Sequence, residues 1–186
     1  MNIYDFDKTI YAGDSTADFL FFCASRHAEV RRMLPKIAWN GMKYLTGAIE
    51  KQTFKEGMFR FLSVIDAKKE LSVFWDGHLD RIKAWYLAQQ REDDLIISAS
   101  PLFIVEEACR RIGIKYILAS PVDPETGKYS GPNCHGEEKV VRLHSAFPDA
   151  VCERFYSDSY SDTPLARLAK EAFLVKGEKI LPWRKF

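Results

Sequence analysis

The chain opens with a short apolar run that ends in two aspartates one residue apart, within Met1-Asn2-Ile3-Tyr4-Asp5-Phe6-Asp7-Lys8-Thr9. Apolar, β-branched and aromatic residues in this order predict a buried strand whose charges emerge at its carboxyl end. Open α/β sheets bind their ligands at that edge. The segment therefore favours a sheet with Asp5 and Asp7 at its ligand-binding edge, although a turn after a strand often holds aspartates for purely structural reasons.

After residue 90 the pattern alternates between strands and helices. We predict strands at 94–98, 114–119, 153–157 and 171–175, and helices near 101–112, 136–146 and 162–169. This alternation is typical of a parallel sheet that helices cover on both faces. A turn at Pro124-Glu125-Thr126-Gly127, with Val122 and Tyr129 beside it, predicts a small hairpin.

Between these two parts, from Ser15 to about Gln90, the apolar residues recur at helical spacing, as at Val30, Met33 and Ile37. We expect three to five helices here. The predicted fold class is α/β: a three-layer, Rossmann-like parallel sheet core with an all-helical cap domain inserted after the first strand. The predicted domains are a core of residues 1–12 and 89–186 and a helical cap of residues 13–88.

Composition narrows the class of protein further. A chain of 186 residues is long enough for one or two small domains. Lys and Arg total 27 against 26 for Asp and Glu, so the charge balance gives no reason to expect a nucleic-acid partner. No apolar run approaches the ~20 residues that span a bilayer, and no secretory leader precedes the first strand. The four scattered cysteines suggest reduced thiols, so we expect a cytoplasmic protein; the oligomeric state stays open.

Two further apolar runs end in small or charged polar residues. One leads into Ser98-Ala99-Ser100 and the other into Ser157-Asp158-Ser159-Tyr160-Ser161-Asp162, and between them Gly136-Glu137-Glu138-Lys139 opens an amphipathic segment. Asp, Ser, Lys and Asp, in that order, resemble the four motifs of the haloacid dehalogenase (HAD) superfamily, in the branch that contains phosphoserine phosphatase. The resemblance covers roughly residues 1–10 and 90–176.

The resemblance implies a role for each motif. Asp5 would be the nucleophile that forms an aspartyl-phosphate, and Asp7 would protonate the leaving oxygen and then activate water. Ser98, with the backbone at Ala99, and Lys139 would hold the phosphate. A cation is needed there, because two unit charges ~4 Å apart repel by about 4 kcal/mol at an effective dielectric of 20. Without the resemblance, Ser98 would be interpreted as a helix N-cap and Lys139 as a solvated side chain.

The resemblance also implies Mg²⁺ as the cofactor. Asp5, the backbone carbonyl of Asp7 and Asp158 would ligate the ion, and Asp162 would bind it through water or orient its neighbours. This arrangement requires the first and fourth strands to be adjacent in the sheet. A plain Ser/Asp loop, with Asp162 capping the next helix, is the structural alternative.

The sequence departs from phosphoserine phosphatases at three places that bear on the substrate. Ala99 and Ser100 replace a Gly-Gly pair, and Ser161 stands where those enzymes have Asn, which argues against phosphoserine. Asp14, nine residues after Asp5, falls where they carry a glutamate that meets the substrate amine. It could bind an ammonium group or only cap a helix.

We therefore expect a magnesium-dependent phosphomonoester hydrolase that acts on a small phosphorylated metabolite. One alternative is a lipid-headgroup phosphatase (phosphatidylglycerophosphate-like) at the membrane surface. It is suggested by a basic segment, Arg26 to Lys36, that precedes Trp39 and Met42. The other is a non-catalytic phosphate-binding domain, which would have no need of a second acid at Asp7.

Overall fold

Six strands form one sheet in the computed structural model, which describes residues 1–184; the last two residues of the predicted core, 185–186, lie outside it. The strand order is β3-β2-β1-β4-β5-β6. The first five strands are parallel and β6 runs antiparallel to β5. The strands are β1 (Ile3–Tyr4), β2 (Leu95–Pro101), β3 (Tyr116–Ser120), β4 (Arg154–Ser157), β5 (Glu171–Lys176) and β6 (Lys179–Pro182).

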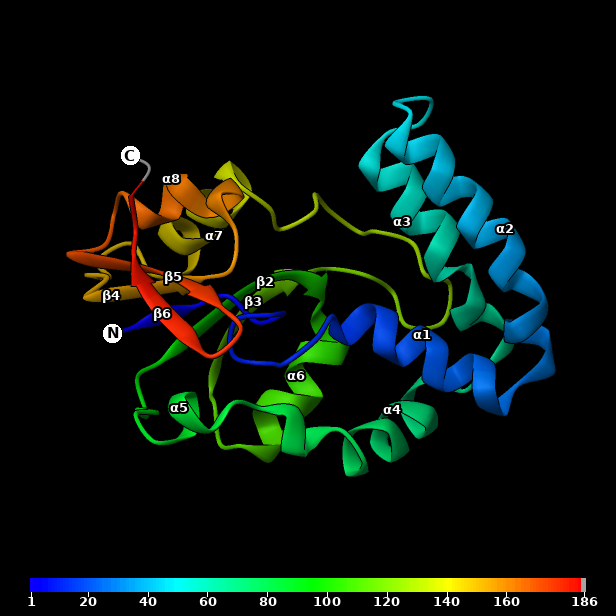
Figure 1. Ribbon diagram of the computed structural model, residues 1–186, viewed down its shortest axis with the longest axis horizontal. Helices are drawn as coiled ribbons and strands as arrows, with labels where there is room; N and C mark the ends of the chain where they lie inside the picture. The colour runs from blue at the N-terminus through cyan, green and yellow to red at the C-terminus, as the bar shows by residue number, and fades with distance from the viewer. Residues whose placement is uncertain (185–186) are drawn as a thin grey trace.

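Alternation along each strand divides the core into two clusters. On β1, Ile3 belongs to one cluster and Tyr4 to the other, and Phe155 and Tyr156 repeat this division on β4. The helices α1 (Ser15–Arg26), α4 (Ala67–Asp76) and α6 (Leu102–Arg111) contribute to the Tyr4 cluster. On the opposite face, α7 (Glu137–Ala146) and α8 (Thr163–Ala166) contribute to the Ile3 cluster. Figure 1 shows these helices on the two sides of the sheet, so the predicted three-layer α/β core is confirmed.

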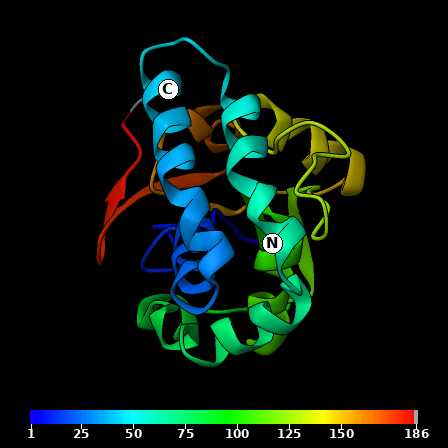
Figure 2. The same ribbon diagram turned by 90° about the vertical axis from the view of Figure 1, so that its right-hand side faces the viewer.

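The segment between β1 and β2 is helical, as the sequence predicted. Within it, α2 (Ala28–Leu45) and α3 (Lys51–Phe59) form an antiparallel hairpin that stands away from the sheet (Figures 1 and 2). Two glycines lie where the helices approach closely: a Cβ at Gly41 would lie 3.6 Å from the Phe54 ring, and one at Gly57 would lie 3.1 Å from Asn40 Nδ2. The remaining short helices are η1 (Arg60–Val64), η2 (Leu79–Arg81), α5 (Ala84–Leu87) and η3 (Tyr160–Asp162).

The later part of the helical segment packs on the sheet. Trp75 of α4 lies edge-on to Phe6 with the ring centroids 6.1 Å apart, and Tyr86 of α5 lies edge-on to Tyr4 at 4.9 Å. Burial of large aromatic surfaces drives such packing. These contacts join residues 75 and 86 to the core cluster, while the α2–α3 hairpin is the part that projects. The boundary between core and cap at residue 88 stays a prediction.

Most predicted core elements begin and end within two residues of the observed ones, and the hairpin at Val122 and Tyr129 is present as an antiparallel bridge. The sequence did not predict β6, whose four residues are all exposed and so carry no pattern of burial. The four cysteines are buried and free of disulfides.

A buried carboxylate joins α1 to α4 and provides a test of this packing. Glu70 is 5% exposed, and its Oε2 accepts a hydrogen bond of 2.7 Å from Arg26 Nε. Burial alone would raise the pKa of Glu70, but the bonds from Arg26 and His27 hold it below its usual value. A carboxyl group whose pKa is lowered by folding stabilises the fold at pH values above its unfolded pKa, about 4.3 for Glu. This contribution is lost as the pH falls from that value through the lower pKa of the folded state.

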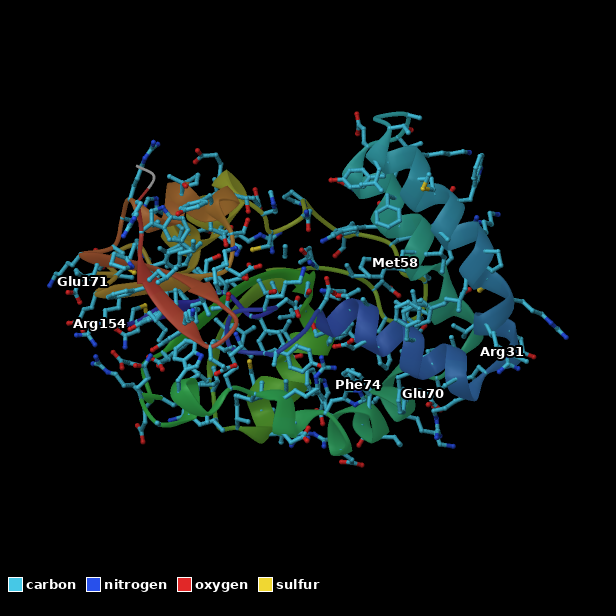
Figure 3. The ribbon with its side chains drawn as sticks, viewed as in Figure 1. Arg31, Met58, Glu70, Phe74, Arg154 and Glu171 are labelled. Carbon is cyan, nitrogen blue, oxygen red and sulfur yellow. The ribbon has the colours of Figure 1, made fainter. Side chains whose placement is uncertain are left out.

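We expect Glu70→Gln to lower stability by about 1 kcal/mol at pH 7, because Arg26 is partly exposed and solvent screens the pair. This corresponds to a Tm lower by about 2–4 °C, with the difference shrinking at pH 3. Glu171→Gln is the matched control, since Glu171 pairs with Arg154, both side chains of that pair are exposed, and the pair lies far from Glu70 in Figure 3. An equal loss in both variants, or a loss independent of pH, would contradict this assignment.

Candidate active site

The carboxyl ends of β1, β2 and β4 open into a cavity of ≈ 450 Å³. Because β1 lies between β2 and β4, the loops that follow the three strands meet at one edge. The expected neighbourhood of the first and fourth strands is therefore confirmed. All of the residues predicted for the site line this cavity, from both ends of the chain: Asp5, Asp7, Asp14, Ser98, Ala99, Lys139, Asp158 and Asp162.

Lys139 lies at the centre of the charged side chains. It follows Gly136, whose positive φ of 60° turns the chain into α7 and brings the first turn of that helix to the sheet edge. The Lys139 side chain is 2% exposed, and its Nζ donates to Asp5 Oδ1 and to Asp162 Oδ2, both at 2.7 Å. Burial alone would lower the pKa of Lys139, but the two carboxylates raise it above its usual value, so the ammonium stays charged.

Asp5 ends the first strand at the floor of the cavity. Its backbone N–H donates to Tyr156 O at 2.8 Å, which extends the pairing of β1 with β4. Thr9 Oγ1 donates to Asp5 Oδ2 at 3.4 Å and accepts 2.9 Å from the Asp158 N–H, so one hydroxyl joins the loops after β1 and β4. Burial raises the pKa of Asp5, with Lys139 opposing the rise and Asp162 adding to it.

Asp7 is held by the start of α1 and by β2. The Ser15 N–H donates to Asp7 Oδ1 at 2.6 Å, and the Ser100 hydroxyl donates to Asp7 Oδ2. Thr16 Oγ1 in turn donates to Ser100 Oγ at 3.1 Å. Burial, followed by the charge of Asp14, raises the pKa of Asp7 to about 6. This pKa lies about one unit below neutral pH, so the carboxyl group is mostly ionised there but takes up a proton far more readily than an ordinary aspartate.

Ser100 was noted in the sequence only as a departure from the family, yet it positions Asp7. The available signal was its spacing, since residues two apart on a strand share a side and Ser98 had already been assigned to the site. Ser98 itself is buried, and its Oγ accepts from the Ser100 N–H at 3.1 Å. The helix α6 has Pro101 as its N-cap, so the interpretation of Ser98 as an N-cap is wrong.

Lys55 joins the site from α3 of the projecting hairpin. Its Nζ donates to Ala99 O at 2.8 Å and to Asn133 Oδ1 at 3.1 Å. The Ser120 hydroxyl also donates to Ala99 O, at 2.9 Å. Nothing in the sequence pointed to Lys55, because only the fold brings α3 to the carboxyl end of β2.

Asp158 and Asp162 follow β4. Asp162 precedes α8, but its side chain makes no capping bond there; instead Oδ2 accepts from Lys139 and from Ser157 Oγ at 2.8 Å. Burial raises the pKa of Asp158, which Lys8 and Lys176 oppose. The carboxylate of Asp162 therefore belongs to the charge network and not to a helix cap.

Of the two roles that the sequence left open for Asp14, the structure shows the helix cap. Its Oδ1 accepts from the Ala17 N–H at 3.0 Å, so Asp14 is the N-cap of α1. It also lines the cavity. Capping therefore takes place, and a contact with substrate stays a prediction.

The carboxylates of the cavity suit a magnesium ion for which the protein supplies only part of the coordination shell. Mg²⁺ prefers oxygen ligands, keeps several waters and is bound by one or two carboxylates together with substrate phosphates. Asp5 and Asp158 line one cavity and can provide such a pair. Within residues 1–184 no group of three or more His, Cys, Asp or Glu side chains is arranged so that it could hold a metal ion by itself. The donor set fits Mg²⁺ and does not resemble the all-protein sites typical of zinc.

Comparison with known proteins places the chain in a family. The sequence pattern described as haloacid dehalogenase-like hydrolase matches residues 3–167. No curated protein matches the chain. A solved structure with similar fold is a protein of unknown function from Bordetella pertussis Tohama I, with 20% identity, a TM-score of 0.74, and coverage of 92% of this chain and 87% of that one.

Two similar structures bear the name of phosphoserine phosphatase or a relative. A phosphoserine phosphohydrolase-like protein from Francisella tularensis subsp. tularensis SCHU S4 has 14% identity and a TM-score of 0.56, covering 92% of this chain and 86% of that one. A phosphoserine phosphatase in the form of a phospho-aspartyl intermediate analogue has 14% identity and a TM-score of 0.53, covering 91% and 83%. The chain thus has the fold of the predicted branch, and it belongs to the haloacid dehalogenase-like hydrolases.

Proposed function

We propose that this hydrolase is a magnesium-dependent phosphatase that cleaves a small phosphomonoester through an aspartyl-phosphate at Asp5. The observation that carries the proposal is the buried Lys139 ammonium, which contacts Asp5 and Asp162 at 2.7 Å in the cavity that Asp7 also lines. A carboxylate attacking a phosphate dianion needs a neighbouring cation and a second acid, and both requirements are met here.

In the first step the Asp5 carboxylate attacks phosphorus, and the bond from phosphorus to the leaving oxygen breaks. Asp7 donates its proton to that oxygen, so the leaving group departs as a neutral alcohol. The pKa of about 6 supports this role, because an ordinary aspartate would be almost fully ionised at neutral pH. Lys139, the Ser98 hydroxyl and the backbone at Ala99 would hold the phosphoryl oxygens.

In the second step Asp7, now ionised, takes a proton from a water molecule that attacks the aspartyl-phosphate. The bond between phosphorus and the Asp5 oxygen breaks, inorganic phosphate is released, and the free Asp5 carboxylate is restored. Asp5, Asp158 and the backbone carbonyl of Asp7 would hold Mg²⁺, with Asp162 orienting its neighbours. When bound, Mg²⁺ supplies positive charge that offsets the repulsion between nucleophile and phosphate.

We further propose that residues 13–88 act as the cap, with the α2–α3 hairpin as the part that covers the cavity. Tyr44, Phe54 and Met58 of this hairpin line the same cavity as the carboxylates, and Lys55 bonds to Ala99 O. Caps of this kind exclude water and select the leaving group.

Replacing the nucleophile tests the proposal directly. We expect Asp5→Asn to reduce phosphate release from para-nitrophenyl phosphate by at least about 10³-fold, because the amide cannot form the covalent intermediate. We also expect EDTA to abolish wild-type turnover and Mg²⁺ to restore it. Circular dichroism of the variant checks that the fold is retained. Activity that survives the substitution would contradict the proposal, and a protein that binds phosphate without hydrolysing any ester would support the non-catalytic alternative.

Removing the acid should separate the two steps. With Asp7→Asn, para-nitrophenol needs no proton to depart, so the first step proceeds while attack by water loses its base, a loss of about 10²–10⁴-fold. We expect a burst of para-nitrophenol equal to the enzyme concentration, and one added phosphoryl group on the peptide containing Asp5 by mass spectrometry. Asp7→Asn with neither burst nor phosphoenzyme would rule out this assignment.

A second candidate function has one observation in its favour. The helix α2 exposes Trp39, Met42 and Leu45, at 62%, 57% and 79% of their surface. This helix also carries four cations, Arg31, Arg32, Lys36 and Lys43, against one acid, Glu29. A helix with these features suits the surface of an anionic bilayer, where a lipid-headgroup phosphatase would act. Among residues 1–184 no helix is long and apolar enough to cross a membrane.

Sedimentation with vesicles decides this candidate. If α2 binds lipid, the protein should sediment with phosphatidylglycerol vesicles at low salt and remain in the supernatant with phosphatidylcholine vesicles, since charge supplies part of the attraction. Trp39→Ser should weaken the binding, whereas Val64→Ser, which removes an exposed apolar side chain outside α2, should not. Absence of binding to anionic vesicles at low salt would eliminate the lipid-surface function.

A further inference from the structure

The two sides of the active-site cavity differ in chemistry. Its floor is made by the charged and hydroxyl groups at the strand ends. The helical segment contributes a different surface, here called the apolar wall, which consists of Ala17, Tyr44, Phe54 and Met58. These residues come from α1, α2 and α3, so three helices build the wall.

The wall has a defined shape. The rings of Tyr44 and Phe54 are stacked, with centroids 5.5 Å apart and planes at 7°. Phe54 and Met58 are four residues apart on α3, so they share one face of that helix. Figure 3 shows Met58 on the side of the hairpin nearer the sheet and Arg31 on its outer side. These side chains are partly buried and border the cavity, which at ≈ 450 Å³ lies within the range of pockets that hold drug-sized molecules.

Three polar side chains on the helical side of the cavity are bonded to the protein itself. Asp14 caps α1, Thr16 donates to Ser100, and Lys55 donates to Ala99 O and Asn133 Oδ1. Apart from the Tyr44 hydroxyl and the second oxygen of Asp14, a leaving group that approaches the wall therefore meets mainly carbon. A leaving group covered with hydroxyl or charged groups would lose water there without gaining equivalent bonds.

We propose that the substrate is a phosphomonoester whose leaving group carries an aliphatic or aromatic body that packs against the apolar wall. This inference rests on the proposed function, because it assumes that the phosphate occupies the floor of the cavity. It assigns Tyr44, Phe54 and Met58 to selection of the leaving group. It also separates the substrate from small polar esters such as phosphoserine and phosphoethanolamine.

Binding of n-alkylphosphonates, which the enzyme cannot hydrolyse, tests the inference without turnover. Calorimetry with Mg²⁺ present would compare ethyl-, butyl- and hexylphosphonate. We expect affinity to rise about threefold for each added methylene, or about tenfold from ethyl to butyl, because each buried methylene adds a similar gain. Phenylphosphonate should also bind more tightly than ethylphosphonate.

An isosteric pair distinguishes the wall from Asp14 as the dominant selector. Propylphosphonate and 2-aminoethylphosphonate have the same length and differ only in a methyl or ammonium end. The inference expects propylphosphonate to bind more tightly. Tighter binding of the amine, or an affinity that does not change from ethyl to hexyl, would overturn it.

A matched pair of methionines locates the effect. Met58 borders the cavity, whereas Met42 is 57% exposed on the neighbouring helix. Met58→Ser should flatten the dependence of affinity on chain length, and Met42→Ser should leave that dependence as in the wild type. If both variants or neither flatten it, the wall is not the binding surface.

Hydrolysis of ethyl and butyl phosphate, followed by phosphate release, separates this inference from the proposed function. The two esters have leaving groups of similar acidity, so a difference in kcat/KM reports binding of the chain. Equal hydrolysis of both esters with flat phosphonate binding would contradict the inference and keep the phosphatase. Binding that strengthens with chain length, without hydrolysis of either ester, would contradict the phosphatase.

Discussion

The arrangement of the site depends on one buried charge. A fully buried ammonium is costly unless it is paired and hydrogen-bonded, and Lys139 obtains both from Asp5 and Asp162. Asp5 directly follows β1 and Asp162 ends η3, the short helix that follows β4, so the ion triplet is complete only when these two strands are adjacent and α7 begins beside them. Ser157 and Thr9 fix the carboxylates in turn. The same contacts that make the burial of Lys139 tolerable thus hold the candidate nucleophile in place.

The five aspartates of the cavity outnumber its three lysines, Lys8, Lys55 and Lys139, and this excess of negative charge supports the proposed divalent cation. Five aspartates line the cavity, and two of them share the Lys139 ammonium. The pKa values of Asp5, Asp7 and Asp158 are all raised, with burial the largest cause for each. Such a cluster favours protons when no other cation is near, and a divalent ion that replaces those protons would return the carboxylates to their ionised form. The electrostatic need that supports Mg²⁺ is therefore a property of the folded chain and not of any one motif.

The sequence predicted the parts of the site that lie at the ends of buried strands. Apolar runs followed by Asp5, Ser98 and Asp158 have a local pattern, and the order of the motifs supplied Lys139. Contacts made by the helical segment had no such pattern. Lys55 and Met58 occupy ordinary positions on an amphipathic helix, and only the packing of the hairpin directs them to the cavity. Helical periodicity shows which residues share a face but does not tell what that face will meet. For the same reason the sequence could not tell whether Trp75 and Tyr86 pack on the sheet or inside a helical cap.

The helical segment also positions Asp7, the proposed general acid. Asp7 belongs to the loop after β1, but its oxygens accept from Ser15 of α1 and from Ser100, which is itself bonded to Thr16 of α1. Asp14, directly before that helix, is the largest charged contributor to the raised pKa of Asp7. A displacement of α1 would therefore change both the orientation of the acid and its tendency to hold a proton. Because α1 leads into the hairpin that carries most of the apolar wall, the proposed contact with the leaving group and the environment of Asp7 are linked through one helix. Asp5, in contrast, is held by Tyr156, Thr9 and Lys139, none of which belongs to the helical segment.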